Sequence, residues 1–238
     1  MKQHLIIIPG WGGTKASWQK FVDLASVDFD LHFISLPCSD DLPCPEKVWG
    51  VDEYAEFVKK EILKLKLENP ILLGHSFGGQ ISVNLIANNP ALVSKLILSG
   101  AAILRPGYVL KRMFFSAIAK VGKFIFKLPL LGNFEQLAKK VIYKTANSPD
   151  YENTLGLKRE IFKKVIRQNQ KDSLAKIKLP TLIVWGSDDK YVPLKEGKAI
   201  AGLISGSELK IIKGGKHGLH IQQPDNLLKI IKEYIEKQ

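Results

Sequence analysis

Cysteine is scarce in this chain, and its two cysteines lie close together in one loop. Cys38 and Cys44 are separated by five residues in a stretch that contains prolines and aspartates. This spacing fits neither a C-x-x-C redox motif nor a complete zinc site, because no second ligand pair follows. A local disulfide is geometrically possible, but a reducing compartment disfavours it. We therefore expect two loop thiols.

Long hydrophobic runs are missing as well. No segment approaches the roughly 18 consecutive apolar residues that a membrane-spanning helix needs. Near the N-terminus only residues 5–8 are apolar before Pro9, a run that is too short for the core of a signal peptide. No internal repeat or low-complexity tract is present. The hydrophobic share of 45% and the charged share of 24% are ordinary for a globular protein, and we expect a cytoplasmic one.

Acidic residues are scarce in the middle of the chain, and this shortage accounts for the net charge of +12. Residues 101–180 contain 17 basic and 5 acidic residues. The counts nearly balance in residues 1–100, with 9 basic and 11 acidic, and in residues 181–238, with 9 and 7. Lysine outnumbers arginine 31 to 4, which indicates a compositional bias and favours a solvated basic surface.

Short apolar segments alternate with amphipathic ones along most of the chain. The pattern predicts strands at residues 4–8, 31–36, 71–73, 95–98, 181–185 and 208–212. It predicts helices at residues 18–25, 51–67, 76–88, 194–203 and 224–237. Such alternation is typical of βαβ units, so we predict an α/β fold whose mostly parallel sheet of about six strands is flanked by helices.

A long stretch without strand pattern separates the fourth and fifth predicted strands. Residues 105–176 indicate several helices. An insertion of this size at the carboxyl edge of a parallel sheet would lie over the crevice where such folds bind ligands. We therefore predict a core formed by residues 1–104 and 177–238, with residues 105–176 as a helical cap.

The most informative motif is a serine between glycines, placed where a predicted strand meets a predicted helix. Gly74, Ser76 and Gly78 form the G-x-S-x-G pattern of a nucleophile elbow. A serine at the tip of so sharp a turn has strained backbone, and side chains two positions away would collide. A serine in an ordinary turn is the alternative, but the strand before and the helix after favour a nucleophile.

Two later motifs extend the pattern, and the chain resembles the α/β-hydrolase superfamily over nearly its full length. Residues 185–193 are similar to the family's W-G-x-x-D-x-x-V-P loop, which implies Asp189 as the acid and Asp188 as a solvated neighbour. Residues 213–224 resemble its G-x-G-H-x-x-H-x-x-x-P segment, which implies His217 as the base and His220 as the rival. The order serine, acid, histidine is that of the family.

The other histidines are interpreted as uninvolved in the chemistry. His4 opens a predicted strand and His32 lies within another, both far from the functional edge of the sheet. His75 directly precedes the serine, and we expect its side chain to point away from the site.

The resemblance also implies an oxyanion hole made of main-chain N–H groups. The matching donors are Trp11, in the loop after the first strand, and Phe77, directly after the serine. Relatives usually have His-Gly where this chain has Pro9-Gly10. They also usually begin with two antiparallel strands, for which this chain has no room, so we expect those strands to be missing.

The predicted cap contains an amphipathic segment with an apolar and a basic face. Phe114 and Ile118 lie on the apolar face, whereas Lys120, Lys123 and Lys127 share the other. The simplest interpretation is a cap helix whose apolar face covers the pocket and whose lysines face water. The lysines could instead attract an anionic substrate or an acidic carrier protein, or rest on an anionic membrane surface. The basic cap and the Gly-Trp-Gly loop at residues 10–12 are similar to those of pimeloyl-carrier-protein methyl ester esterases.

These features predict a serine hydrolase that cleaves carboxylic esters of small molecules. The triad would be Ser76, Asp189 and His217, while Phe114, Ile118 and His220 would line the pocket and its lid. We expect no cofactor, no metal and no nucleic-acid partner. A thioesterase or a hydrolase of carrier-linked esters is the nearest alternative, and a non-catalytic ligand receptor on the same scaffold is the alternative from another class.

Overall fold

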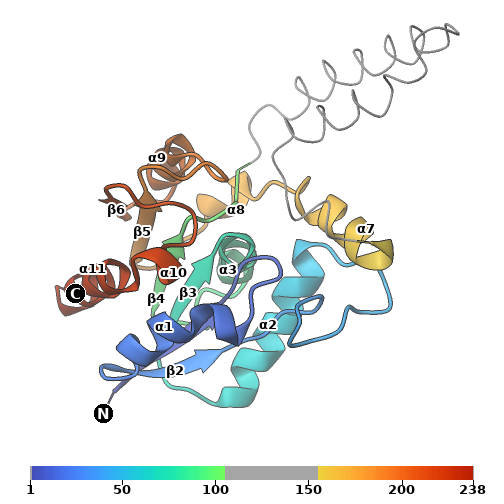
Figure 1. Cartoon of the computed structure of the whole chain (residues 1–238), viewed down its shortest axis with the longest axis horizontal. Helices are drawn as coiled ribbons and strands as arrows, with labels where there is room; N and C mark the ends of the chain where they lie inside the picture. Colours follow the sequence, from blue (N-terminus) through green and yellow to red (C-terminus); the bar gives the residue numbers. More distant parts are fainter. Residues whose placement is uncertain (1, 105–154, 238) are drawn as a thin grey trace, which may run out of the picture.

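A six-stranded parallel sheet forms the centre of the computed structural model, which describes residues 2–104 and 155–237 (Figure 1). The strand order is β2-β1-β3-β4-β5-β6, and every neighbouring pair is parallel. The strands are β1 (Gln3–Ile8), β2 (Phe29–Phe33), β3 (Ile71–His75), β4 (Lys95–Ser99), β5 (Thr181–Gly186) and β6 (Glu208–Ile212). The predicted α/β fold is confirmed, and no antiparallel strand precedes β1 among the described residues.

Helices cover both faces of this sheet. One hydrophobic core contains residues of α2 (Val51–Leu65), α3 (Phe77–Asn88), α7 (Gly156–Val165), α8 (Lys171–Leu174) and α9 (Leu194–Leu203). The core on the opposite face contains residues of α1 (Lys15–Ala25), α10 (Leu219–Gln222) and α11 (Pro224–Glu236). The sequence pattern predicts most of these helices, but it misses the single-turn helix α10.

The central strands are buried on both faces, which explains their continuous apolar sequences. In β1, Leu5 and Ile7 belong to the core beneath α1 and α11, whereas Ile6 and Ile8 belong to the core beneath α2 and α3. All four side chains are fully buried. Such a strand is apolar at every position because successive side chains alternate between two covered faces.

The strand order reverses between β1 and β3. From β1 the chain moves outward to β2, then returns past β1 to β3 and continues in the other direction. In open parallel sheets, ligands bind at such a switch point, outside the carboxyl ends of the strands. The loop after β1 and the turn after β3 both start at this point.

The loop between β2 and α2 is closed by a disulfide, so the expectation of two thiols is wrong. Cys38 and Cys44 are bonded, with their Cα atoms 4.1 Å apart. A short antiparallel bridge between Ser39 and Leu42 folds the loop back on itself and brings the cysteines together. The spacing alone does not reveal this, because the approach depends on the conformation of the turn between them.

The predicted cap is described only at its C-terminal end. Residues 155–176 form α7 and α8, whereas residues 105–154 lie outside the described residues, and with them Phe114, Ile118, Lys120, Lys123 and Lys127. The division into core and cap therefore stays a prediction. Among the described helices, none has the length and apolar character needed to cross a membrane.

Candidate active site

The turn between β3 and α3 places Ser76 in a backbone conformation that L-residues rarely adopt. Its φ is 51° and its ψ −115°, at the position just before the first residue of α3. The flanking glycines are needed for close packing, because a Cβ on Gly74 would lie 2.8 Å from the carbonyl oxygen of Gly78. The Ser76 N–H donates to the carbonyl of Ser99 at the end of β4 (3.1 Å), which ties the turn to the neighbouring strand.

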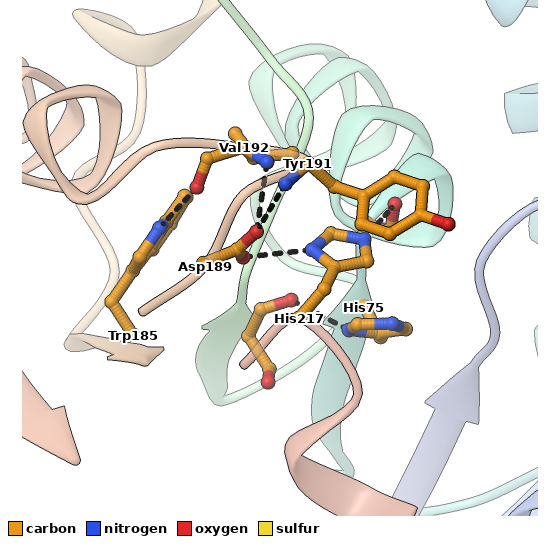
Figure 2. A network of polar contacts seen from close by, with 8 residues as sticks. His75, Trp185, Asp189, Tyr191, Val192 and His217 are labelled. Atoms are coloured by element: carbon orange, nitrogen blue, oxygen red, sulfur yellow. Dashed lines mark hydrogen bonds and ion pairs between the residues drawn. The ribbon is translucent and has the colours of Figure 1, made fainter. Parts of the chain in front are cut away.

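Three side chains from three different loops form a continuous chain of polar contacts (Figure 2). His217 Nε2 lies 2.9 Å from Ser76 Oγ, and His217 Nδ1 lies 2.8 Å from Asp189 Oδ2. Asp189 follows β5 and His217 follows β6, so the carboxyl ends of parallel strands bring these residues together. The structure therefore unites the three residues that the sequence motifs single out.

The carboxylate of Asp189 is buried and fixed at both oxygens. Its side chain is 1% exposed, and its Oδ1 accepts hydrogen bonds from the N–H groups of Tyr191 and Val192, each at 2.9 Å. Trp185 Nε1 donates to the carbonyl of Val192 at 2.8 Å, which holds the loop itself (Figure 2). Oδ2 is thereby oriented toward His217.

Asp188 and His220, the alternative candidates for the acid and the base, are not part of this chain of contacts. Asp188 is exposed and accepts a hydrogen bond from the Ser187 hydroxyl, in agreement with a solvated turn residue. His220 is buried and stacks on Trp18, with ring centroids 3.9 Å apart and an interplanar angle of 11°. Burial, and to a lesser extent the neighbouring His217, lowers the pKa of His220 to about 4. Its predicted contact with substrate stays a prediction.

His75 does not point away from this site, and the expectation that it does is wrong. Its ring centroid lies 4.9 Å from that of His217 and 4.7 Å from that of His220. The reason is that α10 and the loop before it fold over the face of the sheet to which the His75 side chain points. His75 Nδ1 donates to the carbonyl of Ser99 (2.9 Å). Burial, with added repulsion from His220 and His217, holds the pKa of His75 well below its usual range.

Gly100 is a site residue that the sequence motifs miss. Its φ is +52°, and a Cβ at this position would lie 3.3 Å from His217 Nδ1 and 3.4 Å from Asp189 Oδ2. The absence of a side chain thus leaves room for the histidine–carboxylate pair. A glycine just beyond a predicted strand is a visible signal in the sequence, but it does not reveal which distant residues approach it.

The two predicted oxyanion donors stay a prediction, but both belong to segments beside Ser76, because Phe77 follows it directly and Trp11 lies in the loop after β1. Within the described residues, neither N–H group donates to a main-chain carbonyl in the hydrogen bonds of turns, loops and helix caps. The loop that carries Trp11 packs on the serine, because a Cβ on Gly10 would lie 3.2 Å from Ser76 Cβ. That loop is closed by a hydrogen bond from the Gly13 N–H to the Gly10 carbonyl (3.0 Å), so Pro9 is compatible with a compact turn.

Residues that follow α7 dock on the core through buried amides. Gln80 Nε2 of α3 donates to the carbonyl of Gln168 (2.8 Å), and Gln168 Oε1 accepts from the N–H of Val51 (2.8 Å). Asn84 Nδ2 donates to Gln170 Oε1 (3.2 Å). These bonds attach the segment between α7 and α8 to α2 and α3.

Helix α7 also reaches the loop that carries Trp11. The ring centroid of Phe162 lies 5.2 Å from that of Trp11, which in turn lies 5.7 Å from that of Phe77. A row of aromatic rings thus leads from α3 through the loop that carries Trp11 to α7.

Comparison with known proteins agrees with this architecture. The sequence matches the family described as alpha/beta hydrolase fold over residues 3–224. It is 28% identical over 205 residues to the 2-hydroxy-6-oxononadienedioate/2-hydroxy-6-oxononatrienedioate hydrolase of Escherichia coli O139:H28 (strain E24377A / ETEC), covering 78% of this chain and 69% of that protein. It is 28% identical over 209 residues to the AB hydrolase superfamily protein YisY of Bacillus subtilis (strain 168), covering 80% and 75%.

Solved structures share the fold at lower sequence identity. An esterase from Exiguobacterium antarcticum superposes with a TM-score of 0.73 at 20% identity, covering 98% of this chain and 92% of that one. The meta-cleavage product hydrolase CumD from Pseudomonas fluorescens IP01 superposes with a TM-score of 0.70 at 18% identity, covering 99% and 91%. Since the family match spans nearly the whole sequence, the chain belongs to the α/β-hydrolase fold family.

Proposed function

We propose that this protein is a serine hydrolase that cleaves carboxylic esters through an acyl-enzyme on Ser76. The observation that carries the proposal is the contact chain from Ser76 Oγ to His217 Nε2 (2.9 Å) and from His217 Nδ1 to Asp189 Oδ2 (2.8 Å). A nucleophile within hydrogen-bond distance of a base, itself oriented by a buried acid, is the arrangement that nucleophilic catalysis requires.

In the first half of the reaction, Ser76 Oγ attacks the ester carbonyl carbon while His217 Nε2 takes the hydroxyl proton. Asp189 stabilises the resulting imidazolium through Nδ1–H and stays ionised. The carbonyl oxygen becomes an oxyanion and accepts hydrogen bonds from the N–H groups of Trp11 and Phe77. One such donor typically contributes about 3 kcal/mol of transition-state stabilisation. The tetrahedral intermediate then expels the alcohol, which receives the proton from His217.

In the second half, water replaces the alcohol. His217 removes a proton from the water as its oxygen attacks the acyl carbon, and the same two N–H groups stabilise the second oxyanion. Collapse of this intermediate returns the proton to Ser76 Oγ and releases the carboxylic acid. No group beyond the named side chains, the main-chain donors and water is needed.

Hydrolysis of a carbon–carbon bond is a second candidate, because the Escherichia coli relative is named as a hydrolase of a 2-hydroxy-6-oxo dioate. That name describes a substrate with two carboxylates. The excess of basic residues in residues 101–180 of this chain would suit such an anion. A thioester or a carrier-linked ester would be attacked by the same serine, and the basic cap would then contact the acidic carrier.

Labelling with a fluorophosphonate probe tests whether Ser76 is a nucleophile. We expect one equivalent of label on the wild-type protein and none on Ser76→Ala, whereas Ser82→Ala, in the helix that follows Ser76, should still be labelled. Ser82 is a suitable control because its hydroxyl donates to the carbonyl of Gly78 in the preceding turn of the helix (2.7 Å). If the wild type stays unlabelled while Ser76→Ala binds esters unchanged, the protein is a receptor and the proposal fails.

A panel of p-nitrophenyl esters, thioesters and a vinylogous 1,5-diketone acid separates the candidate reactions. We expect the highest kcat/KM on an oxygen ester. If kcat/KM is at least about a hundredfold higher for the diketone acid than for the best ester, the protein is a carbon–carbon bond hydrolase rather than an esterase. The role of Ser76 would then be measured on that substrate.

A further inference from the structure

A second group of titratable side chains lies at the opposite end of the sheet from Ser76. His4 is near the start of β1, and Asp30 and His32 are in the edge strand β2. The strand register sets His4 beside Asp30 and Ile6 beside His32. All three side chains therefore point to the same face of the sheet. His217, by contrast, follows the carboxyl end of β6, so this group is separate from the candidate active site.

The polar atoms of these three residues converge on one point. His4 Nδ1 lies 3.0 Å from Asp30 Oδ2, His32 Nε2 lies 3.6 Å from the same oxygen, and the two nitrogens are 3.2 Å apart. Zinc binds imidazole nitrogen and carboxylate oxygen at about 2.0–2.2 Å in tetrahedral sites, so two of its ligand atoms lie about 3.3–3.5 Å apart. The three measured separations scatter around that value.

The surroundings of the group also suit a cation. Within residues 2–104 and 155–237, no lysine or arginine forms an ion pair with Asp30, and its ion-pair partners there are the two histidines. The side chains of His4 and His32 are 30% and 19% exposed, and that of Asp30 is 55% exposed. An ion can therefore enter from solvent, and a water can occupy the fourth ligand position.

We propose that His4, Asp30 and His32 form a binding site for a divalent transition-metal ion of the zinc class. The ion links β1 to the edge strand β2 through His4 Nδ1, Asp30 Oδ2 and His32 Nε2, with water as the fourth ligand. Two imidazoles and one carboxylate favour zinc over magnesium or calcium, which prefer sets of oxygen ligands. The site is independent of ester hydrolysis and adds a structural link at an edge of the sheet.

Calorimetric titration of the full-length, tag-free, chelator-treated protein with zinc chloride tests the site. We expect one ion per chain, and a dissociation constant at least about tenfold weaker in both His32→Asn and Asp30→Asn. Asp28→Asn is the matched control. It removes the same charge just before β2, where Asp28 pairs with Lys232 (2.8 Å), and it should bind zinc like the wild type.

Two further measurements distinguish this site from zinc binding elsewhere on the chain. Cobalt in place of zinc should produce the intense visible absorption of a tetrahedral complex in the wild type and in Ser76→Ala, but not in Asp30→Asn. His4→Gln, at the more exposed of the two histidines, keeps the test valid if His32→Asn fails to fold. Equal zinc affinity in the wild type, His4→Gln and Asp30→Asn, or zinc binding that is lost only on changing His217, would overturn the proposal.

Discussion

Gly100 lies so close to His217 that a methyl group on its Cα would stand 3.3 Å from the imidazole Nδ1. The same glycine has a φ of +52°, a conformation that costs an alanine about 1–2 kcal/mol. Backbone conformation and side-chain clearance therefore both require glycine at this position, directly beneath the bond between the proposed base and its acid.

We predict that Gly100→Ala lowers kcat by about tenfold to a hundredfold. The added methyl displaces His217, and small misplacements of a catalytic group are costly. Gly206→Ala is the matched control, since Gly206 has a φ of +75° and nothing within 4 Å of its would-be Cβ. Both variants should lose similar stability in urea unfolding, but only Gly100→Ala should lose activity. Full activity in Gly100→Ala would show that the pair tolerates displacement.

Asp189→Asn should lower kcat by about 10³- to 10⁴-fold with little change in fold. The amide cannot stabilise the imidazolium, and it favours the wrong tautomer of His217. Asp188→Asn is the adjacent control and should stay within about twofold of the wild type, because its side chain is exposed. Steady-state kinetics on the best p-nitrophenyl ester measure both. A larger loss in Asp188→Asn would reverse the assignment of the acid.

Stability should fall in mild acid because His220 is buried in its neutral form. Its pKa is about 4 in the folded protein, against 6.5 for an unperturbed histidine. Above about pH 7 both folded and unfolded forms are neutral at this residue. As the pH falls below 6.5, only the unfolded chain takes up the proton, so the free energy of unfolding decreases by roughly 2 kcal/mol at about pH 5. Below about pH 4 the loss levels off.

Urea unfolding at about pH 7.5 and about pH 5 measures this effect. His220→Phe keeps an aromatic ring against Trp18 and removes the titration, so its stability should depend less on pH than that of the wild type. The lowered pKa of His75 acts in the same direction in both proteins. An unchanged pH dependence in His220→Phe would assign the acid sensitivity to other groups.

The basic middle of the chain should make the protein faster on anionic substrates at low salt. Residues 101–180 contain 17 basic and 5 acidic residues, and salt screens such attraction over about 10 Å at 0.1 M. We expect kcat/KM for an ester with a free carboxylate to fall roughly threefold or more between about 0.02 M and about 0.3 M sodium chloride. The value for the matching neutral ester should stay nearly constant.

Replacing Lys120, Lys123 and Lys127 by glutamine should reduce this salt dependence. A second triple variant that carries the same change at three exposed lysines outside the predicted cap, Lys195, Lys198 and Lys229, is the control. If both variants behave alike, the net charge of the whole protein causes the effect rather than the cap. Sedimentation with anionic vesicles tests the membrane alternative. That alternative requires that the wild type sediments with the vesicles and that the cap variant does not.

The bond between Cys38 and Cys44 should be detectable by intact-mass measurement, as a loss of two hydrogens relative to the reduced chain. Closing so short a loop contributes about 2 kcal/mol at most to stability. Cys38→Ser combined with Cys44→Ser should therefore unfold at slightly lower urea concentration, and reducing agent should bring the wild type to the same value. A wild-type mass equal to that of the reduced chain would contradict the bond.

Most of the fold is visible in the sequence because its patterns report burial. Five of the six strands lie within about two residues of their predicted positions. The edge strand β2 is the exception, since it spans Phe29–Phe33 whereas the prediction covers residues 31–36. Ile34 and Leu36 are buried in the core without belonging to the strand, so an apolar pattern that continues beyond a strand marks burial rather than strand pairing.

By itself, the sequence determined the alternation of strands and helices along the chain, the turn at Ser76 and the few candidate partners of this serine, because local spacing encodes turns and buried faces. Tertiary structure alone decided which distant groups meet. It set Gly100 beneath His217, turned His75 toward the site, and closed the cysteine loop. It also brought His4 and His32 together with Asp30. Such contacts depend on strand register and on loops that cross a sheet, and those follow from the packing of the whole chain rather than from any one segment.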